Sequence, residues 1–230
     1  MKRIAIFDID GTIFRSSLLI EVTEAMIQEG LFPQSAKKMY HAAYRKWSDR
    51  KGAYEDYIWG VVRAFEVHIK GVSRKEFLKV VRRVVSFHRD RVYRYTRDLV
   101  KDLKKKRYTV IAISHSPKEL VDEFCSMYGF DKTYGRVYEV GAKGAFTGRV
   151  LHLELINDKA KLLKRAVAKK GFSLKGSVGV GDSEGDISFL KLVEKPICFN
   201  PNKKLYAHAR RAGWEVIVER KDVVYHLHTQ

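Results

Sequence analysis

Short apolar runs alternate with segments of helical periodicity along most of the chain. Within each run the apolar residues are consecutive, as expected for strands that are covered on both faces of a sheet. Helical spacing follows most of these runs, and several helical segments end at a glycine. This order predicts a doubly wound α/β core with parallel strands and right-handed crossovers. The predicted strands are 4–9, 108–114, 177–180, 197–200 and 214–218, and the predicted helices are 118–128, 158–170, 187–192 and 203–211.

The stretch from about 16 to 89 departs from this rhythm, because it contains four helical patterns and no convincing strand. It is inserted just after the first predicted strand, so we expect it above the carboxyl end of that strand, where α/β sheets bind their ligands. We therefore predict a core domain of residues 1–15 and 90–230 and a helical cap domain of residues 16–89. The aromatic residues of the insertion are expected mainly in its own core.

The composition is that of a folded soluble protein, with 230 residues, 45% apolar and 31% charged. The longest apolar runs are of strand length, and the first ten residues resemble no signal peptide, so we expect a cytoplasmic protein without a transmembrane segment. Cys125 and Cys198 both lie within apolar patterns, which favours reduced, packed side chains. The sequence leaves the oligomeric state open.

The net charge of +18 is the unusual bulk property. A charge of this sign suits nucleic acid, an anionic membrane surface or small polyanionic substrates. The excess is spread over the insertion and the core, which favours a solvated basic surface over a dedicated binding patch. A nucleic-acid partner stays possible but is not favoured.

Two aspartates end the first predicted strand. Asp8 and Asp10 are two residues apart, so in an extended chain both side chains point to the same side, into the crevice at the sheet edge. Their repulsion costs about 1 kcal/mol even in water. A shared proton or a divalent cation would offset it, and Mg²⁺ is the oxygen-preferring cation of phosphate enzymes. Gly11 allows a sharp turn that brings backbone amides near the bound group.

Three further features follow predicted strands or begin helices. Ser114 ends the second strand, and its hydroxyl with the following amides suits a phosphate oxygen at a helix start. Asp182 ends the next strand and precedes Asp186, amid glycines that permit close approach of the backbone. Lys159 opens a helix between them. Acid pair, hydroxyl, cation and second acid pair occur in this order along the chain.

This order and these residue types resemble the haloacid dehalogenase superfamily of phosphohydrolases. The helical insertion and the tail at 200–214 are similar to those of its phosphoserine phosphatase-like branch, in which a Rossmann-like core carries a helical cap. The resemblance covers essentially the whole chain. The matching motifs are Asp8-Ile9-Asp10-Gly11-Thr12, Ser114, Lys159 and Gly181-Asp182-Ser183-Glu184-Gly185-Asp186.

The resemblance implies a Mg²⁺-dependent phosphatase that hydrolyses a phosphomonoester. Asp8 would be the nucleophile that forms an aspartyl-phosphate, and Asp10 the general acid and base. The metal ligands would be the Asp8 carboxylate, the Asp10 backbone carbonyl and Asp182. Asp186 would support a metal-bound water or orient Lys159. Lys159 and Ser114 would bind the phosphate. From their positions after the first two predicted strands, Gly11 and His115 are further candidates for contact with phosphate or substrate.

The substrate is where the sequence departs from phosphoserine enzymes. Leu19 occupies the position of the glutamate that reads the substrate amine, and Glu21 and Glu24 are most simply exposed. His115 replaces a glycine beside the expected phosphate pocket, where it either contacts substrate or packs. We expect a small phosphorylated substrate, with a nucleic-acid-end phosphatase or a nucleic-acid-binding protein as the alternative. A non-catalytic interaction protein would require a lost motif, and none is lost.

Overall fold

The computed structural model describes residues 2–227, which form two compact units. Unit 1 contains the chain up to Ser16, Arg89–Arg136 and the chain from His152 onward, and unit 2 contains Ser17–His88 and Val137–Leu151. Residues 17–88 of the predicted cap thus share a unit with 137–151, a stretch that the sequence analysis placed in the core domain. As a domain assignment, 16–89 stays a proposal.

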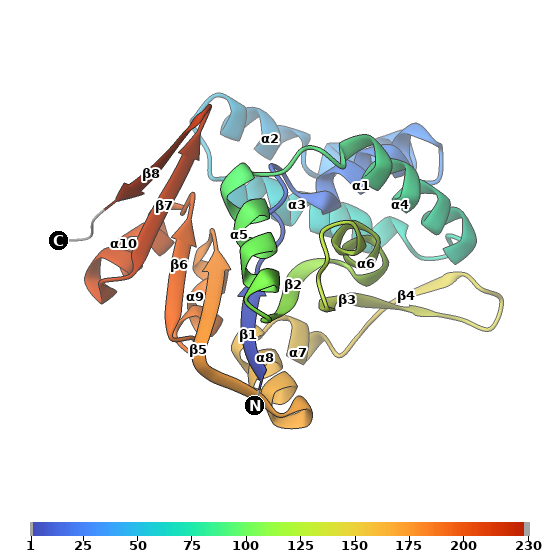
Figure 1. Cartoon of the computed structure of the whole chain (residues 1–230). Coiled ribbons are helices and arrows are strands. Elements are labelled where there is room, and N and C mark those ends of the chain that lie inside the picture. The colour runs from blue at the N-terminus through green and yellow to red at the C-terminus, as the bar shows by residue number, and fades with distance from the viewer. Residues whose placement is uncertain (1, 228–230) are drawn as a thin grey trace. The chain divides into compact units, whose positions relative to one another are not determined.

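Unit 1 is built on a mostly parallel sheet (Figure 1). Within it the strand order is β3-β2-β1-β5-β6-β7-β8, with parallel neighbours up to β7 and an antiparallel β8. The predicted α/β fold class is confirmed, and all five predicted strands exist. The bounds are β1 Lys2–Phe7, β2 Thr109–Pro117, β3 Lys132–Val140, β5 Phe172–Gly181, β6 Lys195–Phe199, β7 Glu215–Arg220 and β8 Val223–Leu227.

Two helices of unit 1, α8 and α10, begin and end where the sequence signals them. Side chains of Asp158 and Asn202 accept hydrogen bonds from the first turns of α8 and α10, and left-handed Gly171 and Gly213 end these helices. The bounds are α5 Arg94–Lys105, α6 Lys118–Ser126, α7 Leu153–Ile156, α8 Lys159–Lys170, η2 Glu184–Asp186, α9 Ile187–Leu190 and α10 Lys203–Ala212.

Side chains of the central strands are buried on both faces of the sheet, as the consecutive apolar residues require. Ile4 and Ile6 join a core cluster with residues of α8, α9 and α10. Phe7 points to the opposite face, where its ring centroid lies 5.9 Å from that of Phe130. This two-sided burial fixes the carboxyl edge of the sheet as a rigid platform.

Unit 2 is mainly helical, and its helices differ in how far they are buried. All five predicted core positions of α4 (Phe77, Val80, Val81, Val84 and Val85) are buried. In contrast, α2 contains no buried residue. Tyr44 and Trp47, expected in the core, instead pack their rings against Tyr57 near the surface. The bounds are α1 Leu18–Gln28, η1 Gln34–Met39, α2 His41–Ser48, α3 Tyr54–His68, α4 Arg74–His88 and β4 Phe146–Leu151.

A β-hairpin completes the core of unit 2. The second half of β3 pairs antiparallel with β4, with Tyr138 opposite Val150. Tyr138 and Phe146 are buried, and their ring centroids lie 5.3 Å from Phe65 and 5.4 Å from Phe77, respectively. The hairpin therefore belongs to unit 2 because its apolar side chains bury against α3 and α4.

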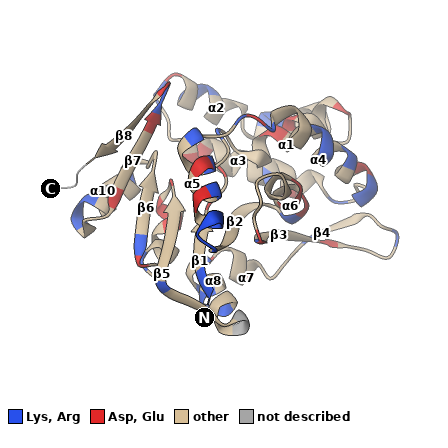
Figure 2. Cartoon of the chain, in the orientation of Figure 1, with Lys and Arg blue, Asp and Glu red and all other residues tan. Residues whose placement is uncertain are grey.

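The distribution of basic residues and the burial of the two cysteines agree with the sequence analysis. Lys and Arg are distributed over helices of both units rather than confined to one element (Figure 2). Cys125 and Cys198 are buried and unbonded to each other, which confirms their packed, reduced role. Among residues 2–227, no helix is both long enough and apolar enough to span a bilayer.

The hairpin packing predicts a large stability effect at Phe146, which is only 2% exposed. Replacing Phe146 by Ala should lower the free energy of unfolding by about 3–5 kcal/mol, because a buried aromatic ring leaves a cavity. Urea denaturation measures this loss. Phe87→Ala is the matched control, because Phe87 is 82% exposed and its truncation should change stability by less than about 0.5 kcal/mol. Equal losses in the two variants would contradict the hairpin packing.

Candidate active site

The residues expected to carry chemistry converge at the carboxyl edge of the sheet in unit 1. Asp8 follows β1 directly, and its backbone N–H donates to the Val180 carbonyl of β5 at 2.9 Å. Asp182 follows β5, and Ser114 lies in the last part of β2. Parallel strands bring their carboxyl ends to one edge, so residues far apart in sequence become neighbours.

A buried lysine links two of these acids. The Lys159 ammonium donates to Asp8 Oδ1 and to Asp186 Oδ1, each at 2.6 Å. Lys159, Asp8 and Asp186 are 3%, 5% and 0% exposed, so the charges interact with little screening by water. Burial alone would lower the pKa of Lys159, but the charges of Asp186 and Asp8 raise it above its usual value, which keeps the ammonium protonated.

Asp182 joins Asp8 and Asp186 in an acidic cluster. Carboxylate oxygens of the three residues lie within 4.8 Å of one another. Burial is the main reason that the pKa of Asp8 rises to about 7, and Asp186 and Asp10 add to the rise. Burial and the charges of Asp8 and Asp186 also raise the pKa of Asp182 well above its usual value. Clustered, desolvated carboxylates of this kind fit a hard divalent cation such as Mg²⁺.

Two glycines allow the backbone to approach these acids closely. Gly11 has φ +80°, and a Cβ there would lie 2.1 Å from Asp182 Oδ2. A Cβ at Gly181 would lie 2.6 Å from the Cβ of Asp186. Gly11 therefore has a second role besides permitting the turn after Asp10, because only glycine leaves space for the Asp182 carboxylate.

Asp10 is held by two serines rather than by the acidic cluster. Its Oδ2 accepts hydrogen bonds from Ser114 Oγ at 2.6 Å and from Ser116 Oγ at 3.0 Å. Ser114 Oγ in turn accepts from the Ser116 backbone N–H at 2.9 Å. The sequence analysis did not assign Ser116 a role, although its spacing of two from Ser114 in a strand was a usable signal. The predicted contact of Ser114 with phosphate stays a prediction.

Both carboxylate oxygens of Asp186 accept hydrogen bonds. Besides the Lys159 contact of Oδ1, its Oδ2 accepts from the backbone N–H groups of Asp182 and Ser183, each at 3.1 Å. Of the two roles that the sequence left open, orientation of Lys159 is the one that these contacts favour.

His115 lies beside this network as an exposed residue of β2, and its ring hydrogen-bonds to the backbone of α7. Its Nε2 is 3.0 Å from the Ile156 backbone oxygen, which can only accept, so Nε2 carries the hydrogen. Desolvation of the ring lowers the pKa of His115 to about 4, and the positive charges of Lys159 and Arg136 act in the same direction. The ring is therefore neutral at pH 7.

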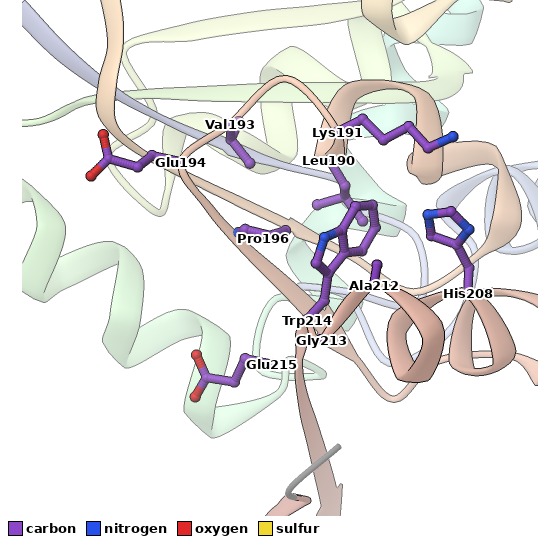
Figure 3. A pocket seen from close by; sticks show the side chains of 10 residues that line it. All are labelled: Leu190, Lys191, Val193, Glu194, Pro196, His208, Ala212, Gly213, Trp214 and Glu215. Carbon is purple, nitrogen blue, oxygen red and sulfur yellow. The ribbon is translucent and has the colours of Figure 1, made fainter. Parts of the chain in front are cut away.

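A separate pocket lies at the opposite edge of the sheet. It has a volume of about 560 Å³ and is lined by the starts of β6 and β7 and the end of α10, including Pro196, His208 and Trp214 (Figure 3). The His208 and Trp214 rings meet edge to face at 4.8 Å. The pocket contains none of the motif residues, so its size does not make it the candidate active site.

The chain belongs to the haloacid dehalogenase-like hydrolases, because the model of that family matches residues 5–191. The predicted superfamily is thereby confirmed, and the chain is a hydrolase. A histidinol-phosphatase of Neisseria meningitidis serogroup C (strain 8013) is 25% identical over 94% of this chain and 99% of its own length. The predicted class, a phosphoric monoester hydrolase, agrees with that relative.

Solved structures share the fold at lower identity. A protein of unknown function from Bordetella pertussis Tohama I has a TM-score of 0.75 at 18% identity, over 94% of this chain and 98% of that one. A phospho-aspartyl intermediate analogue of phosphoserine phosphatase has a TM-score of 0.63 at 22% identity, over 96% and 95% of the two chains. These likenesses show that the chain shares the fold of those proteins.

The close approach at Gly11 predicts that Gly11→Ala weakens binding of divalent cations. A methyl group there would displace the Asp182 carboxylate, and we expect the Mg²⁺ dissociation constant measured by calorimetry to rise by about 10-fold or more. Gly144→Ala is the matched control, because Gly144 also has positive φ but a Cβ added there would meet no atom within 4 Å. Equal Mg²⁺ affinity in Gly11→Ala and in the wild type would contradict the assigned role.

Proposed function

We propose that this protein is a Mg²⁺-dependent phosphatase that hydrolyses a small phosphomonoester through an aspartyl-phosphate on Asp8. One observation carries the proposal. The Lys159 ammonium is fixed within hydrogen-bond distance of the Asp8 carboxylate, beside an acidic cluster that includes Asp182. A nucleophile, a cation for phosphoryl oxygens and a metal-binding carboxylate therefore share one sheet edge, which is what phosphoryl transfer requires.

The Asp8 and Asp182 carboxylates and the Asp10 backbone carbonyl would hold Mg²⁺. Asp186 supports the proposed site indirectly, because its oxygens bind Lys159 and the backbone of the Asp182 loop. When bound, the cation supplies positive charge that lets an anionic nucleophile and an anionic phosphate approach each other.

The chain's own residues account for the proton and bond changes. Asp8 attacks phosphorus as the bond from phosphorus to the leaving oxygen breaks, and Asp10 donates a proton to that oxygen. Asp10 then takes a proton from the water that attacks the aspartyl-phosphate, which frees Asp8 and inorganic phosphate. Lys159 compensates charge on the phosphoryl oxygens. The hydroxyls of Ser114 and Ser116 orient the Asp10 carboxyl for both proton transfers.

Three residues of α1 bear on whether the substrate is phosphoserine. Leu19 is buried in α1 and cannot read an amine. Contrary to the sequence interpretation, Glu21 and Glu24 are not simply exposed. Glu21 lies 3.2 Å from His88 Nε2, and Glu24 accepts from the Tyr40 hydroxyl and pairs with Lys37. Because compared proteins are named histidinol-phosphatase and phosphoserine phosphatase, a substrate panel should include histidinol phosphate and phosphoserine. It should also include larger and more anionic phosphomonoesters.

Release of phosphate from an aryl phosphate tests the proposal. We expect turnover by the wild type with Mg²⁺, loss of turnover in EDTA, and a fall of at least about 10³-fold in Asp8→Asn, because an amide cannot form the covalent intermediate. Asp158→Asn is a matched control, because Asp158 is an exposed helix cap whose amide oxygen still accepts from Lys161 N–H. Turnover that persists in purified Asp8→Asn would refute the assigned nucleophile.

A second candidate function, a nucleic-acid-end phosphatase or nucleic-acid-binding protein, is favoured by one groove in unit 2. The groove has a volume of about 480 Å³, and four cations of α4 line it together with Leu78, Val140 and Gly144. The cations are Arg74, Lys75, Lys79 and Arg82. No acidic residue belongs to the lining, although the Lys79 ammonium donates to Glu76 Oε1 at 2.9 Å. The excess of cations makes the groove suited to a phosphate backbone.

An oligonucleotide tests this second function. If the groove binds nucleic acid, affinity should fall by at least about 10-fold between about 50 and 200 mM salt, and Lys79→Glu with Arg82→Glu should abolish binding. Fluorescence anisotropy measures both effects, and release of a terminal phosphate from the same oligonucleotide tests the catalytic version. Affinity that is unchanged in the double variant would exclude the groove.

A further inference from the structure

The turn before Lys159 is held from two strands. His115, near the end of β2, donates from Nε2 to the Ile156 carbonyl at 3.0 Å. Arg136, on β3, donates from Nη2 to Asn157 Oδ1 at 3.3 Å. Ile156 and Asn157 are the end and the C-cap of α7, so both contacts meet one short segment of chain.

Burial and strand pairing fix the position of Arg136. It is only 5% exposed and lies opposite Pro117 in the pairing of β3 with β2. The preceding residue is Gly135, where a Cβ would lie 2.7 Å from the Lys118 Cα. This close approach seats β3 against the start of α6, so the guanidinium extends from a rigid support toward Asn157.

The held turn leads directly into α8. Asp158 accepts from the Lys161 backbone N–H at 2.9 Å and caps the helix, and Lys159 is its first residue. The position of this turn sets the point on the backbone from which the Lys159 ammonium reaches Asp8 and Asp186 together. A displacement of about 1 Å at a catalytic group can cost about 10²-fold in rate.

We infer that His115 and Arg136 are positioning residues, which fix the 156–158 turn and thereby place the Lys159 ammonium against Asp8. His115, although its side chain is exposed on β2, then acts through the backbone of α7 rather than by contact with substrate. The expected effect on kcat rests on the proposed phosphatase function. The expected effect on the order of the 156–158 turn does not.

Hydrogen exchange tests the structural part. In Asn157→Ala, amides of residues 157–161 should exchange at least about 10-fold faster than in the wild type, because the contact that closes the turn is lost. Asn157 is exposed, so this substitution removes no core packing, whereas Arg136→Met removes a buried charge. Arg165→Met, at an exposed site on α8, is the control and should leave exchange unchanged. Unchanged exchange in Asn157→Ala would overturn the inference.

A double-mutant cycle tests the kinetic part. Asn157→Ala and His115→Ala should each lower kcat by about 10-fold or more, and by the same factor for aryl and alkyl phosphates. The same substitutions in Lys159→Met should cost less than about 2-fold, because their effect passes through Lys159. Asn157→Asp keeps an acceptor for Arg136 and should retain activity within about 3-fold.

Additive losses in the cycle, or a KM effect of His115→Ala that depends on the leaving group, would overturn the inference in favour of direct substrate contact. If Arg136→Met fails to fold, Asn157→Ala still decides between the outcomes. If the wild type shows no Mg²⁺-dependent turnover, the proposed function fails, and hydrogen exchange alone then decides whether the turn is held as inferred.

Discussion

The compensation of buried charge at Lys159 is the interaction on which the site depends. An ammonium and two carboxylates share a space that water barely reaches, and leaving any one of them uncompensated typically costs about 3–5 kcal/mol. Their balance explains why α8 must begin at the carboxyl edge of the sheet. It also explains why Asp186 binds the backbone after β5 with its second oxygen, because a fixed acid holds the lysine in one place.

Close backbone approach is the second constraint, and it works together with the first. Gly11 and Gly181 leave room for Asp182 and Asp186, so the acids can gather where larger residues would separate them. Burial of the clustered acids, together with their mutual repulsion, raises the pKa of Asp8 and Asp182. The same repulsion is what makes the cluster a fitting site for a divalent cation.

The hydrogen-bond partners of Asp10 differ from those of this cluster, and the difference has chemical meaning. Asp8 is tied to a cation, as suits a carboxylate that must act as nucleophile. Asp10 is tied to two neutral hydroxyls, which can orient a carboxyl whether or not it carries a proton. Two aspartates only two residues apart thus lie in different surroundings, and these suit the different roles proposed for them.

The sequence by itself determined the α/β core and the motif positions, because consecutive apolar residues, helix caps and strand-end acids are local signals. It did not reveal the β3–β4 hairpin, in which Tyr138 and Phe146 pack against Phe65 and Phe77 of distant helices. Nor could it pair Asp10 with Ser116, or His115 with Ile156. Those partners are chosen by contacts between residues far apart in the chain, which exist only once the strands are in register.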